Sequence, residues 1–82
     1  MNIVTYEERI AKMNKPGDED KQLRLAKQYV RRLRVKLKKT NSLVKKVEIN
    51  KAVTGSECVL RKLRLNIFDI EDMLFERSSL LT

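Results

Sequence analysis

The fold prediction starts from the stretch DEDKQLRLAKQYVRRLRVKLKKTNSLVKKVEINKAVT, residues 18–54. Its apolar residues alternate at spacings of three and four, the coiled-coil pattern of a helix that packs one narrow face against another helix. The positions of this stripe are Leu23, Ala26, Val30, Leu33, Leu37, Thr40, Val44 and Val47. Residues 19–53 are therefore predicted to form one long helix, which is strongly basic because it carries 12 Lys and Arg against 3 Asp and Glu.

The weak point of this predicted helix is the segment Thr-Asn-Ser at residues 40–42. These residues have modest helix propensity, and their side chains compete for backbone hydrogen bonds. They can lie exposed in a continuous helix, or they can break it with a new N-cap at Asn41 or Ser42. A continuous helix is favoured, because the apolar stripe keeps its phase through Thr40.

Shorter helices are predicted on both sides of the long one. Thr5 and Glu8 fit a capping box that starts a helix over about residues 5–14, and Pro16 with Gly17 ends it. A turn at residues 54–57, with Gly55 at its centre, precedes a last helix over about 57–77. The seam of that helix, meaning the apolar stripe that packs against another helix, is Leu60, Leu63, Ile67, Ile70 and Leu74, widened by Val59, Phe68, Met73 and Phe75.

The sequence thus predicts a single all-α domain over residues 1–82, an antiparallel helical hairpin with a short N-terminal helix. Folding back at Gly55 would place Asp69, Asp72 and Glu76 beside the basic block at residues 31–39. Apolar residues outside the seam predict a dimer or a higher oligomer, because one hairpin would not cover them all. These residues are Leu25, Tyr29, Val35, Leu43 and Ile49.

The net charge of +8 on 82 residues points to an acidic partner. Basic doublets recur seven residues apart, about 10 Å along one helix face. The simplest interpretation is a solvated face that also pairs with the acidic C-terminal helix. A ladder for nucleic-acid phosphates is the next, followed by docking of an acidic helix or of a membrane surface. The predicted contact residues are Arg24, Arg31, Arg32, Lys38, Lys39, Lys45 and Lys46.

Catalysis is not predicted, because the chain has no His and no glycine-rich loop that could hold a phosphate. Asp69, Glu71 and Asp72 are interpreted as charged surface rather than as metal ligands or catalytic groups. Cys58, the single cysteine, is expected to be buried and excludes an intrachain disulfide. We expect no cofactor and no small-molecule substrate. Without a leader peptide or an apolar run of about 20 residues, a soluble, cytoplasmic protein is predicted.

In length and lysine-rich composition, the whole chain resembles the small cytosolic regulators that tailed bacteriophages encode, among them the cytoplasmic antiholin of T-even-type phages. The resemblance rests on no motif, and no residue is carried over from it. It implies a regulator that binds the cytosolic segment of a holin and delays lysis. The function predicted is therefore protein–protein binding by a non-catalytic helical regulator, with a basic nucleic-acid-binding protein as the alternative.

Overall fold

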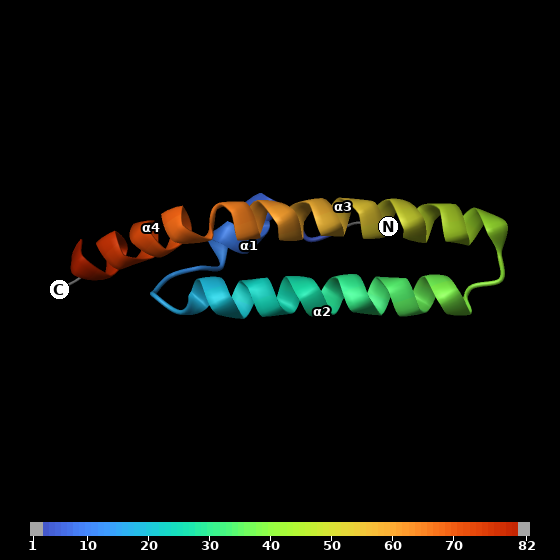
Figure 1. The fold of residues 1–82 in the computed structure, drawn as a ribbon, viewed down its shortest axis with the longest axis horizontal. Helices are drawn as coiled ribbons and strands as arrows, with labels where there is room; N and C mark the ends of the chain where they lie inside the picture. The colour runs from blue at the N-terminus through green and yellow to red at the C-terminus, as the bar shows by residue number, and fades with distance from the viewer. Residues whose placement is uncertain (1–2, 81–82) are drawn as a thin grey trace.

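The computed structural model describes residues 3–80, which form four helices and no strand. These are α1 (Tyr6–Ala11), α2 (Asp18–Lys39), α3 (Leu43–Leu65) and α4 (Ile67–Leu80). Helices α2 and α3 lie antiparallel along most of a rod that measures 53 × 18 × 15 Å (Figure 1). Helix α4 continues from α3 past the start of α2, and α1 packs against α3. The all-α class and the helical hairpin are confirmed.

The prediction of one continuous helix over 19–53 is wrong, because the hairpin turns at residues 40–42. Thr40 is extended (φ −85°, ψ 130°), and its hydroxyl donates a hydrogen bond of 2.7 Å to the carbonyl of Lys36. Ser42 is the N-cap of α3, and its hydroxyl accepts from the backbone N–H of Lys45 at 3.5 Å. Side-chain hydrogen bonds to the backbone thus end one helix and begin the next.

The predicted turn at residues 54–57 is also wrong, because Gly55 lies inside α3. The last helix, predicted over 57–77, is divided between α3 and α4 by Asn66 (φ −105°, ψ 9°). The side-chain amide of Asn66 donates to the carbonyl of Lys62 at 3.0 Å, a hydrogen bond to the last turn of α3. A buried stripe runs through α3 on both sides of Gly55: Ile49, Ala52, Val53, Ser56, Val59, Leu60 and Leu63.

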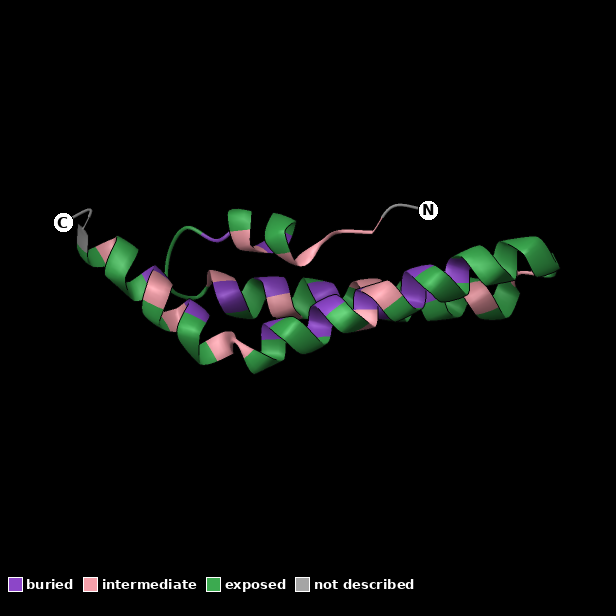
Figure 2. Cartoon of the chain, turned by 90° about the horizontal axis from the view of Figure 1, so that it is seen from above, coloured by how far each residue is buried: buried purple, intermediate pink, exposed green. Residues whose placement is uncertain are grey.

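Two buried clusters hold the helices together. Figure 2 marks the buried residues along the helices in purple. The larger lies toward α1 and α4 and contains Met13, Ala26, Val30, Val59, Leu60, Leu63, Ile70 and Leu74, with Leu23 packed against it. The smaller contains Leu33, Ile49, Ala52 and Val53, with Tyr29 and Leu37 packed against it. Ile49 and Tyr29 are therefore covered within one chain and give no reason for oligomerisation.

The seam predicted for the long helix fails beyond the turn, where Val44 and Val47 are exposed. Reversal of the chain at 40–42 gives α3 a helical phase of its own, and the buried face begins only at Ile49. The seam of the last helix is buried, except that Ile67 is only half-buried.

Helix α1 covers one side of the hairpin and is shorter than predicted. The backbone N–H of Glu8 donates to the hydroxyl of Thr5 at 3.2 Å, which confirms Thr5 as its N-cap. Arg9 is buried and donates to the side-chain oxygen of Gln22 on α2 at 3.2 Å. Burial lowers the pKa of Arg9, because the charged form loses hydration.

The two glycines are expected to respond in opposite ways to substitution by alanine. Gly17, the N-cap of α2, has φ of +103°, so Gly17→Ala is expected to cost about 1–2 kcal/mol. Gly55 is helical, and Gly55→Ala should gain up to about 1 kcal/mol of helix propensity. The new Cβ would lie 2.8 Å from Cδ1 of Ile3, the flexible end of that side chain, which must shift slightly. Thermal unfolding measures both variants; a loss in Gly55→Ala as large as that in Gly17→Ala would contradict the prediction.

The turn before α2 predicts a dependence of stability on pH. A carboxylate oxygen of Asp18 accepts from the backbone N–H groups of Asn14 at 2.9 Å and Lys15 at 3.3 Å. These hydrogen bonds, that of Asn14 first, lower the pKa of Asp18. Because the folded pKa lies below the unfolded value of about 3.9, this contribution is present above that pH and is lost as the pH falls through the folded pKa. In Asp18→Asn, the midpoint of thermal unfolding should therefore fall less steeply with decreasing pH than in the wild type. The same pH dependence in both proteins would contradict the prediction.

Candidate binding surfaces

The turn at residues 40–42 gathers basic side chains at one end of the rod. Lys38 and Lys39 end α2, and Lys45 and Lys46 lie in the first turn of α3; all four are exposed. The doublet Lys45–Lys46 belongs to α3, the other arm of the hairpin. It therefore does not continue the basic face of α2, as the predicted ladder for phosphates requires. We call residues 36–48 the tip; they contain five Lys and one Glu.

The tip also exposes aliphatic side chains. Leu43 is 78% exposed, Val44 72% and Val47 52%. They lie in the first two turns of α3, before its buried face begins at Ile49, and the described parts of α1 and α4 pack toward the other end of the rod (Figure 1). Neighbouring exposed apolar side chains inside a polar rim are typical of an interaction surface.

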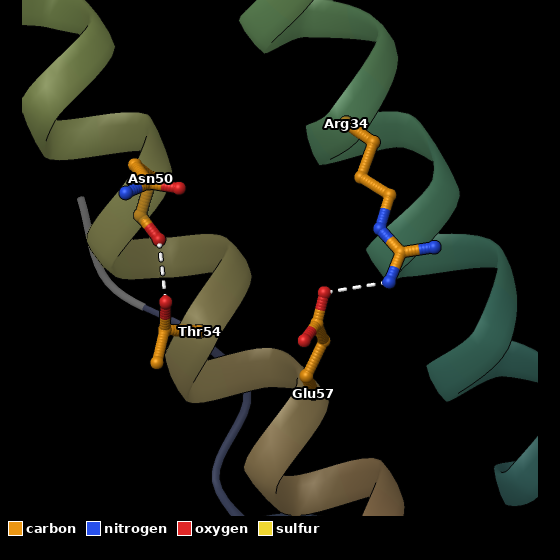
Figure 3. A network of polar contacts seen from close by, with 4 residues as sticks. All are labelled: Arg34, Asn50, Thr54 and Glu57. Carbon is orange, nitrogen blue, oxygen red and sulfur yellow. Dashed lines mark hydrogen bonds and ion pairs between the residues drawn. The ribbon is translucent and has the colours of Figure 1, made fainter.

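A second basic surface follows the outer side of α2. Arg24, Arg31 and Arg32 are exposed, and residues 21–39 contain no Asp or Glu. Arg34 differs from these, because its guanidinium lies 2.6 Å from the carboxylate of Glu57 on α3 (Figure 3). This ion pair is well exposed to solvent, so it contributes at most about 1 kcal/mol.

The acidic helix α4 does not lie beside the basic block at 31–39, so that prediction is wrong. Because the hairpin turns at 40–42, α4 lies at the other end of the rod, near the start of α2. There Arg77 donates to the carbonyl of Met13 at 3.3 Å, and carboxylate oxygens of Glu19, Asp20 and Glu71 lie within 4.8 Å of one another. Glu71 of α4 therefore meets two acids of α2, and the tip is left without the counter-charges of α4.

The outer face of α4 is both acidic and aromatic. Phe68 is 76% exposed and Phe75 68%, and Asp72 lies between them at helical spacing on the same side. Asp69 and Glu76 are also exposed. The sequence prediction that Phe68 and Phe75 widen the seam is therefore wrong. The sequence does contain an indication of this exposure. Asp72 follows Phe68 by four residues and precedes Phe75 by three, so it shares their face, and a charge there disfavours burial of that face.

Two other predicted sites have a different setting from the one expected. Cys58 is exposed rather than buried, because it lies on the side of α3 opposite the buried stripe. The acidic residues interpreted as surface include Glu71, which belongs to the carboxylate cluster with Glu19 and Asp20. In that cluster, the carboxylate of Glu19 already accepts from the backbone N–H of Gly17 at 2.9 Å.

Comparison of the chain with protein-family models, with curated proteins and with solved structures gave no match. Within residues 3–80, none of the helices combines the length and the apolar character needed to cross a bilayer. The candidate binding surfaces are the tip, the outer side of α2 and the outer face of α4.

Two matched substitutions test which part of the predicted seam is buried. Leu33→Asp places a charge in the smaller cluster and should cost about 3–5 kcal/mol, enough to unfold a small domain. Val44→Asp changes an exposed residue in the first turn of α3, where a negative charge suits the helix dipole, and should change stability by about 0.5 kcal/mol or less. Urea unfolding followed by circular dichroism measures both. Comparable losses in the two variants would contradict the hairpin register.

Proposed function

We propose that this protein is a small, non-catalytic helical regulator that binds another protein through the tip of its hairpin. The observation that supports the proposal is the group of exposed aliphatic side chains at Leu43, Val44 and Val47 within a lysine-rich rim. Burying these side chains against a partner would remove apolar surface from water, which is favourable. The lysines would select a partner of opposite charge.

The partner that fits the tip is an acidic amphipathic helix. Such a helix can place apolar side chains on Leu43 and Val47 and carboxylates beside Lys39, Lys45 or Lys46. Opposite charges would speed encounter and fix orientation, whereas the apolar contact would supply most of the affinity. The α-helical arms of the tip are rigid supports, so little conformational entropy would be lost on binding.

The resemblance to T-even-type phage antiholins suggests a more specific form of this proposal. The partner would then be the cytosolic segment of a holin, and the outcome of binding would be a delay of lysis. The tip supplies a surface for such a segment. The identity of the partner and the cytoplasmic location are part of the proposal.

Nucleic-acid binding is the second candidate, and the outer side of α2 favours it. Arg24, Arg31 and Lys38 follow one another at helical spacing with no acidic residue among residues 21–39. Phosphates would be attracted to this face. Bases, however, need exposed aromatic side chains on which to stack, and Phe68 and Phe75 lie on the acidic α4. We therefore expect only weak binding without sequence preference at physiological salt.

The test is affinity capture with the tagged protein from a nuclease-treated lysate of the cells that produce it. We expect a protein partner with an acidic helical segment to be retained at about 0.15 M salt, where long-range attraction between exposed charges is screened. Leu43→Ser/Val44→Ser should abolish the capture, because it removes the apolar contact and leaves every charge in place. Binding is then remeasured with the purified partner.

Arg24→Ala/Arg31→Ala provides the matched control, because it alters α2 without touching the aliphatic side chains of the tip. This variant should retain the partner. Capture that requires nucleic acid, or that fails in the α2 variant and survives in the tip variant, would contradict the proposal. Either result would instead support nucleic-acid binding by the outer side of α2. The logarithm of that binding constant should fall by about 0.7–0.9 per phosphate contact for each tenfold rise in salt concentration.

A further inference from the structure

We propose that the outer face of α4 in one copy of this chain docks on the tip of a second copy, so that the protein associates head to tail. The inference rests on the tip surface of the proposed function and names an additional occupant for it. The two surfaces are complementary in both charge and apolar character, and one chain carries them at opposite ends.

The complementarity begins with the apolar residues. On α4, Phe68 and Phe75 are seven residues apart, about 10 Å along the helix, and both are more than two-thirds exposed. On the tip, Leu43 and Val47 occupy one side of α3 across about 6 Å, with Val44 beside them. Two aromatic rings can therefore straddle this short aliphatic patch.

The charges around these residues have opposite signs. Residues 67–80 carry four Asp and Glu and one Arg, whereas residues 36–48 carry five Lys and one Glu. Asp69, Asp72 and Glu76 are exposed around the two phenylalanines, and Lys39, Lys45 and Lys46 are exposed around the aliphatic patch. Docking would place carboxylates beside ammonium groups along the rim of the contact.

One chain cannot make this contact with itself. The tip and α4 lie at opposite ends of a rod 53 Å long, and the packed α2–α3 pair between them keeps them apart (Figure 1). The contact must therefore join two molecules. It leaves a free tip on one molecule and a free α4 on the other, so that further copies can add.

Symmetric pairing of like surfaces is disfavoured by charge. A tip-to-tip contact would bring two lysine clusters together, and a contact between two α4 faces would do the same with carboxylates. Like charges at close range repel, and the repulsion is reduced only where salt screens it. The heterologous contact is the arrangement in which apolar surface is buried and the charges attract.

Self-association would also regulate the proposed function. An acidic helix from another protein and α4 of a second copy would occupy the same tip. At high protein concentration, the partner would then have to displace α4, and a variant that lacks the aromatic face should bind the partner more tightly.

The test is a mixing experiment with two variants followed by sedimentation velocity. The tip variant, Leu43→Ser/Val44→Ser, keeps α4, and the α4 variant, Phe68→Ser/Phe75→Ser, keeps the tip. All four positions are exposed, so both variants should retain wild-type circular dichroism. Leu25→Ser, at an exposed leucine of α2 outside both surfaces, is the matched control.

We expect the wild type and the Leu25→Ser control to associate with increasing concentration into species larger than dimers. Each of the two variants alone should sediment as a 9.7 kDa monomer, with association weakened on the order of tenfold or more. Their equimolar mixture should form a two-chain complex and nothing larger, because only one intact tip can meet one intact α4. Raising the salt concentration should weaken that complex.

A wild type that remains monomeric, or a mixture that sediments like its separate components, would overturn the inference. A wild type that stays monomeric yet binds phosphatidylglycerol vesicles through the tip would overturn it in favour of a membrane surface. The proposed function fails separately, because the α4 variant retains the tip. If that variant captures the partner while the wild type is monomeric, only the head-to-tail contact is excluded.

Discussion

Packing of α2 against α3 is the interaction on which the rest of this structure depends. Leu33 lies with Ile49, Ala52 and Val53 in one cluster, and Ala26 and Val30 lie with residues of α3 in the other. Both helices also contribute a small buried residue to the interface, Ala26 from α2 and Ala52 from α3. Because this interface extends along nearly the whole of α2, it fixes the turn at 40–42 as one end of the molecule.

The same interface separates charge along the rod. The charged side chains of residues 21–39 are all positive, and the start of α3 adds Lys45 and Lys46 beside the end of α2. The pair of Arg34 with Glu57 offsets little of this, because it is exposed to solvent. The repulsion is therefore tolerated through apolar packing and through screening by solvent and salt. The result is a basic, partly aliphatic end opposite an acidic, partly aromatic one.

Helix α1 makes the apolar covering of the hairpin unequal. Met13 belongs to the larger cluster, and Tyr6 and Ile10 pack against it, so the end near α4 has a third layer. Ile3, which precedes α1, packs against both clusters. Ile3 approaches α3 at Gly55, where a side chain would restrict that approach. Helix α1 lies away from the turn between α2 and α3 (Figure 1). Leu43 and Val44, next to that turn, stay exposed. An exposed tip thus follows from a covering helix of only six residues.

The sequence alone determined the helical character of this chain, together with several of its boundaries and core positions. Thr5 starts a helix because its hydroxyl accepts a hydrogen bond from a free backbone N–H group. The acidic run that begins at Asp18 favours a helix start because its negative charges lie at the positive end of the helix dipole. The spacing of Leu60, Leu63, Ile70 and Leu74 predicted their burial, because a helical period requires only one common face. The exposure of the basic doublets on α2 and α3 followed from the cost of burying charge.

Only the tertiary structure decided where the chain turns. Residues 40–42 and the segment around Gly55 both carry local signals for ending a helix, and local propensity separates them by little. Turning at 40–42 packs Ile49, Ala52 and Val53 against α2, whereas turning at Gly55 would require burial of Val44 and Val47 instead. That choice also placed α4 far from the basic block and exposed Phe68 and Phe75. Whether the acidic and basic surfaces meet depends on which helices pack together. The period of a single helix predicts its apolar face but not the helix that packs against it.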